Sequence, residues 1–97
     1  MTTRRAPARV ERVQTGIRVE KRILKVTKAL AEYLDLSLGD LLEGVLLHTF
    51  EGRVPFSRDT QQKIADLKKV YGLTLMAKDS HRLSEAGPPP RSRESAG

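Results

Sequence analysis

One short run of alternating residues constrains the fold of this 97-residue chain more than any other feature. From Val13 to Val19, three β-branched apolar residues and a threonine alternate with polar residues and a glycine. This period-two pattern is typical of a half-buried β-strand. The sequence from there to about residue 50 is helical in its periodicity, so the first fifty residues contain no second strand. Because a lone strand is unstable in water, its simplest partner is the same strand of a second copy.

Helical periodicity begins at about Lys21 and predicts three helices, over about 21–34, 38–51 and 58–71. Ser37 and Ser57 are placed to cap the second and third helices, and Gly72 to end the third. The residues that follow, 73–84, fit either a short strand or a helical turn. The fold class predicted is mainly α with one N-terminal β-strand.

The same patterns divide the chain into four parts. The ends are poor in apolar periodicity, and the second end contains three consecutive prolines, so we expect both to be disordered. The predicted parts are a basic arm at 1–10, a core at 11–52, a helical extension at 53–84 and a Pro-rich tail at 85–97.

The second predicted helix carries more apolar surface than one short neighbour can cover. Its apolar residues are expected to be core, either within one chain or between two; they are Leu41, Leu42, Val45, Leu46 and Phe50. Below roughly 70–80 ordered residues, a chain usually needs a disulfide, a metal or a partner subunit. The chain has no Cys and only His48 and His81, which leaves a second copy as the simplest stabilising partner.

Positive charge is concentrated at the start of the chain, whose formal net charge is +6. Residues 1–28 hold nine Lys+Arg and two acids, residues 29–52 hold five acids and no Lys or Arg, and residues 53–97 hold nine bases and five acids. A basic segment of this kind makes a polyanion a plausible partner.

The sequence gives little support for an enzyme. It contains no Gly-rich phosphate loop, no metal-ligand cluster and no nucleophile elbow, so we expect no catalysis, no cofactor and no metal. It also lacks a signal-peptide-like apolar run and any window of about 18 apolar residues, so we expect a cytoplasmic protein, associated with the nucleoid if it binds DNA.

The predicted order of elements resembles the ribbon-helix-helix family of Arc- and MetJ-type repressors. Within about 40 residues, a strand is followed by a helix, a short turn with a capping serine and a second helix. The resemblance covers Arg12 to about Phe50. It implies an intertwined homodimer whose two strands form an antiparallel ribbon in the DNA major groove, with an extra C-terminal helix here. The function it implies is that of a bacterial-type transcriptional regulator that prefers certain DNA sequences.

The resemblance also implies which residues contact DNA. The outward strand positions would read base edges: Gln14, Gly16 and Arg18, with Arg12 just before them. Arg and Gln suit this role, because they pair bidentately with guanine and adenine respectively. Backbone N–H groups of Leu38 and Gly39, behind Ser37, would bind a phosphate. Further phosphate contacts would come from Lys21 and Arg22, then from Lys25 and Lys28, which also fit a solvated helix face. Apart from the resemblance, Arg4, Arg5 and Arg9 fit either an arm that reaches phosphates or a minor groove, or a purely solubilising tail.

Two alternatives remain open from the residues alone. In the first, the chain is an antitoxin-like interaction module whose residues 53–84 dock on a partner protein; the competing interpretation is that these residues cap the core. In the second, the chain is a monomeric helical domain, and residues 12–19 are a segment folded back on it.

Overall fold

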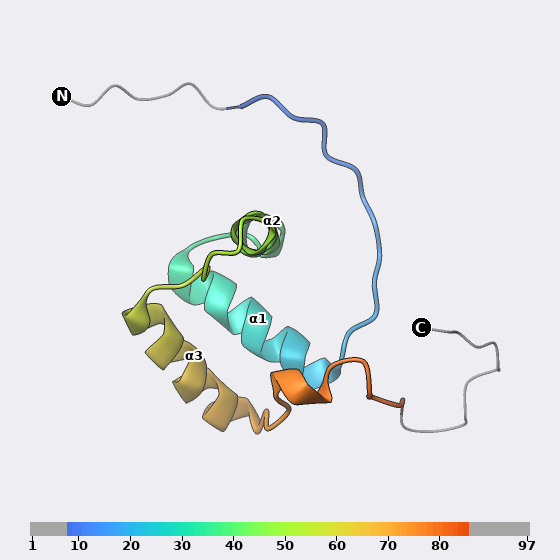
Figure 1. The fold of residues 1–97 in the computed structure, drawn as a ribbon, viewed down its shortest axis with the longest axis vertical. Coiled ribbons are helices and arrows are strands. Elements are labelled where there is room, and N and C mark those ends of the chain that lie inside the picture. The colour runs from blue at the N-terminus through green and yellow to red at the C-terminus, as the bar shows by residue number, and fades with distance from the viewer. Residues whose placement is uncertain (1–7, 86–97) are drawn as a thin grey trace.

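The computed structural model describes residues 8–85 and consists of three α-helices and one turn of 3₁₀-helix (Figure 1). The helices are α1 (Lys21–Leu34), α2 (Leu38–Phe50) and α3 (Arg58–Tyr71), and the turn is η1 (Ala77–Asp79). The three predicted helices and the predominance of α-structure are confirmed. Arg4, Arg5 and most of the predicted arm and tail lie outside the described residues.

The prediction of an N-terminal strand is wrong, and with it the ribbon-helix-helix fold class. Across residues 8–85 no β-strand is present, so the intersubunit ribbon of an intertwined dimer is absent as well. Residues 8–19 are extended and exposed, and their backbone makes no hydrogen bond to another described residue. The alternating side chains are not buried, since Val13 is 80% and Ile17 73% exposed. A strand needs the backbone of another strand, and this part of the chain offers only helices.

The core lies where α2 and α3 meet α1. In Figure 1, α3 runs back alongside α1 in the opposite direction, and α2 is seen end-on beside the C-terminal half of α1. Leu30, Ala31 and Leu41 form the buried cluster. Partly buried apolar residues pack around it from all three helices and the connection before α3; they are Leu34, Val45, Phe56, Ile64 and Leu67.

Local capping explains where each helix begins. The hydroxyl of Ser37 accepts a hydrogen bond from the Asp40 N–H at 3.1 Å, and Ser57 caps α3 in the same way. Both predicted serine caps are therefore confirmed. The cap of α1 is Glu20, whose carboxylate accepts from the Ile23 N–H at 2.9 Å.

Left-handed residues end two of the helices. Asp35 follows α1 with φ of 61°, and Gly72 follows α3 with φ of 67°. The predicted stop at Gly72 is confirmed, because glycine adopts this conformation without the steric cost of a Cβ. Of the two possibilities for residues 73–84, the structure has the helical turn, at η1.

Candidate nucleic-acid interface

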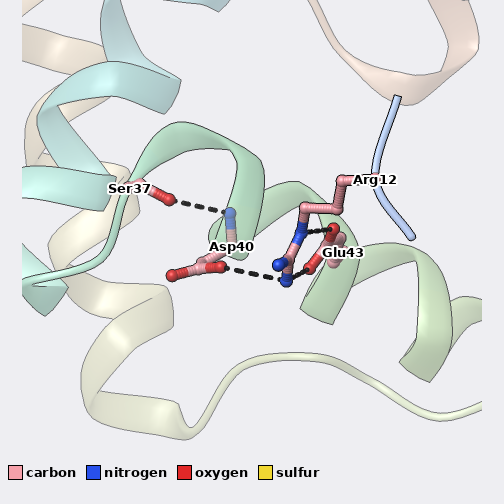
Figure 2. Close-up of polar contacts among 4 residues, drawn as sticks. All are labelled: Arg12, Ser37, Asp40 and Glu43. Carbon is pink, nitrogen blue, oxygen red and sulfur yellow. Dashed lines mark hydrogen bonds and ion pairs between the residues drawn. The ribbon is translucent and has the colours of Figure 1, made fainter. Parts of the chain in front are cut away.

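Arg12 ties the extended N-terminal segment to the start of α2 (Figure 2). Its Nε and Nη2 donate to the two carboxylate oxygens of Glu43, each at 2.8 Å. The same Nη2 lies 3.7 Å from an oxygen of Asp40. We call these three residues the Arg12 clamp. The bidentate geometry is the strongest that an Arg–carboxylate pair adopts.

Arg12 and Glu43 are both ionised at neutral pH. The side-chain hydrogen bond from Arg12 holds the pKa of Glu43 below its ordinary value, and the charge of Arg12 adds to this effect. The same hydrogen bond and the charge of Glu43 raise the pKa of Arg12 further above neutrality. Protonation of Glu43 would therefore weaken the clamp, because it removes a charge that the arginine stabilises.

The local sequence of α2 places the two acids on one side of the helix. Capping by Ser37 makes Asp40 the third residue of the helix, and Glu43 follows three residues later. Residues three apart lie next to each other on a helix surface, so both carboxylates face Arg12. An acid in the first turn is also stabilised by the positive end of the helix dipole.

The predicted base-reading residues do not gather at one place. Arg18 lies away from α2, and its Nη2 pairs with a carboxylate oxygen of Glu85 at 2.8 Å. Gln14 and Gly16 are exposed, and a Cβ placed on Gly16 would meet nothing within 4 Å. Of the predicted readers, Arg12 alone makes a hydrogen bond or ion pair with α2, beside the residues predicted to bind phosphate.

The predicted phosphate contacts fall into two groups. Ser37 and Gly39 line the same groove as Arg12, and Leu38 is the first residue of α2. Lys21 and Arg22 begin α1. Arg22 also has a structural role, because its Nη1 donates to the carbonyl oxygen of Gly72 at 3.1 Å and so joins the start of α1 to the end of α3.

An apolar groove of about 850 Å³ separates the extended segment from α2. Its largest apolar lining residues are Val10, Val13, Leu46, Leu47 and Phe50. All five are exposed, from Leu46 at 49% to Val13 at 80%. Because the opposite side of α2 carries the buried Leu41, this helix is apolar on two sides. A helix of that kind is normally covered on both sides.

Glu43 is the site residue that sequence reasoning missed. The signal was the spacing of Asp40 and Glu43, which puts two acids on one side of a helix. Their partner lies 31 residues from Glu43 in the sequence, and no local pattern identifies it.

Other kinds of site have no support in this part of the chain. Residues 8–85 contain no group of three or more His, Cys, Asp or Glu placed to hold a metal ion. None of the helices described is long and apolar enough to cross a membrane. Comparison with family models, curated proteins and solved structures gives no match to this chain.

Proposed function

We propose that this protein binds double-stranded DNA as a homodimer and acts as a transcriptional regulator. The observation that carries the proposal is the placement of positive charge. Residues 8–28 contain seven Lys+Arg and two acids, and six of the seven cationic residues are exposed. They lie along the extended segment and the start of α1, where a DNA backbone can approach them without any rearrangement of the core.

The extended segment supplies groups suited to DNA. Arg9, Arg12 and Arg18 are exposed along it, and Gln14 stands between the last two. Arginine grips phosphate oxygens or a guanine edge with two parallel hydrogen bonds. An extended basic segment outside a folded core is a common way to contact DNA phosphates and grooves. Such a protein would work in the cytoplasm, at the nucleoid.

The apolar groove supports a second copy as the partner. At roughly 100 Å² per fully exposed side chain, its five exposed apolar residues leave on the order of 300 Å² uncovered. A standard interface buries about 800 Å² per partner, of which about 60% is apolar. The exposed apolar area of the groove is about two thirds of that apolar share. The rim carries both signs of charge, on Arg12 and Glu43. A two-fold axis can therefore pair the face with itself without bringing only like charges together.

The position of α3 favours a role in capping the core over a role in docking another protein. Ile64 and Leu67 pack against the buried cluster of the same chain. Lys63 places its Nζ 4.7 Å from the centroid of the Tyr33 ring on α1, which adds a cation–π contact to this packing. The helix is thus used by the fold itself.

Salt dependence of DNA binding tests the proposal. Three exposed arginines per copy give about six phosphate contacts per dimer, so log Kobs should fall with log[salt] with a slope of about −5. Fluorescence anisotropy with a labelled duplex, titrated at several salt concentrations, measures this slope. Absence of binding at low salt, or binding that salt does not weaken, would contradict the proposal.

A matched pair of variants locates the DNA-binding surface. Arg18→Ala and Lys69→Ala each remove one exposed positive charge, the first from the extended segment and the second from α3. Arg18→Ala should weaken binding and reduce the salt slope by about 1 for each phosphate that is no longer neutralised. Lys69→Ala should leave both quantities nearly unchanged. Equally weakened binding in the two variants would show that only total charge matters.

A further inference from the structure

We propose that the Arg12 clamp is an autoinhibitory contact, in which the acidic start of α2 occupies the arginine that DNA must engage. The inference rests on the proposed function, because it assigns a regulatory role to the same basic segment. The clamp is formed by Arg12 with Glu43 and Asp40, at 2.8 Å and 3.7 Å.

In the clamp, Glu43 occupies two donors of the Arg12 guanidinium group. Arg12 uses its Nε and Nη2 together on Glu43. This pair of donors is one of the edges with which a guanidinium grips phosphate or guanine bidentately. While the clamp is closed, that edge is unavailable to DNA. The carboxylates of Glu43 and Asp40 also stand where an approaching phosphate would be repelled.

The ion pairs of the clamp are exposed to solvent. The side chain of Arg12 is 62% exposed and that of Glu43 47% exposed, so water and salt reach both. Exposed ion pairs are weak and are screened by salt. The clamp therefore opens readily, and a polyanion that offers several phosphates can displace a single pair of carboxylates. It reduces DNA affinity without preventing binding.

Position along α2 separates the two acids of the clamp from the apolar residues that this helix contributes to the groove. Asp40 and Glu43 lie in the first half of the helix, whereas Leu46, Leu47 and Phe50 lie in the second. Arg12, Asp40 and Glu43 line the same groove as these apolar residues, so a second copy packed on the groove lies beside the ion pairs.

The test compares Glu43→Gln with Glu51→Gln in the full chain. Both variants remove one negative charge from α2 or its end, but Glu51 pairs with Arg53 and makes no contact with Arg12. Glu43→Gln should raise affinity for a labelled duplex roughly two- to fivefold at low salt. Glu51→Gln should change it far less. An equal gain in the two variants would overturn the clamp in favour of a general effect of net charge.

The Arg12→Ala background sharpens the comparison. Without Arg12 there is no guanidinium to release, so Glu43→Gln should no longer raise affinity in that background. A gain of the same size would show that Glu43 acts on DNA directly, and the clamp would be refuted.

A measurement without DNA separates failure of the clamp from failure of the proposed function. Trypsin needs the free side chain of the arginine that it cleaves after, and the chain offers Arg9 as an internal reference close to Arg12. Cleavage after Arg12, relative to cleavage after Arg9, should be faster in Glu43→Gln than in wild type or Glu51→Gln. An unchanged ratio would overturn the clamp. If wild type does not bind DNA but the ratio rises, the contact between Arg12 and Glu43 stands, whereas the DNA-binding proposal fails and the autoinhibitory role fails with it.

Discussion

Two leucines on opposite sides of α2 provide a decisive comparison of the single chain with the proposed dimer. Leu41 is 4% exposed within the chain, whereas Leu47 is 64% exposed. Replacing each with alanine removes the same atoms from the same helix, so helix propensity changes equally in the two variants. Any difference in stability therefore reports what covers each side chain.

The structure sets the expected magnitudes. Leu41→Ala should lower the free energy of unfolding by about 3 kcal/mol, because it leaves a cavity in a packed cluster. That is a large share of the total, which is about 4–12 kcal/mol for a chain with this many ordered residues. In an isolated chain, Leu47→Ala should cost only about 0.5–1 kcal/mol, since about a third of the side chain is covered. In the proposed dimer it should cost about 2–3 kcal/mol per chain, because the partner buries the remainder.

Thermal unfolding at two protein concentrations measures both quantities. For a dimer, a rise from about 2 µM to about 200 µM adds RT ln 100, or about 2.7 kcal/mol, which raises the Tm by about 5–10 °C. Leu47→Ala and Leu41→Ala should each lower the Tm at both concentrations, and the concentration dependence should persist in both because unfolding of the dimer is coupled to its dissociation. A Tm independent of concentration, with a cost for Leu47→Ala below about 1 kcal/mol, would refute the reasoning and favour the monomer.

Three further predictions concern helix ends. Ser37→Ala should cost about 1 kcal/mol in urea unfolding, because the Asp40 N–H loses its acceptor; an unchanged midpoint would show that water replaces the cap. Gly72→Ala should cost about 1 kcal/mol in the same assay, because φ is 67° there; a neutral outcome would argue against the left-handed stop. The hydrogen bond from the Ile23 N–H lowers the pKa of Glu20 below 4.5. The stabilisation that this hydrogen bond gives is therefore present above pH 4.5 and is lost as the pH falls through the lowered pKa. The Ile23 amide should lose protection from hydrogen exchange on acidification in wild type but not in Glu20→Gln, once the exchange rates are corrected for their intrinsic pH dependence.

Helices were predictable from the sequence because their determinants are local. Periodicity, the serines at 37 and 57 and Gly72 lie within or next to the helices that they define. Glu20 was missed as a cap, since it follows an alternating run that pointed to a strand.

The strand prediction was wrong because alternation shows which side chains could share one face of a strand, but not whether another strand is present to pair with its backbone. Val13 and Ile17 alternate correctly, yet no backbone in the described chain pairs with theirs. The Arg12–Glu43 contact joins residues 31 apart, so only the three-dimensional arrangement reveals it. The apolar residues of α2 were expected to be core, but within one chain only Leu41 is buried, with Val45 partly buried beside it.

A residue-resolved NMR titration of the full chain with a short DNA duplex tests DNA binding most directly. We expect the amide signals of residues 8–28 to shift with increasing duplex, most strongly around Arg12 and Arg18, and to return as salt is added. The signals of α3 should move little, because that helix packs on the core. Shifts confined to α3, or none at low salt, would contradict the assignment of residues 8–28 as the DNA-binding surface.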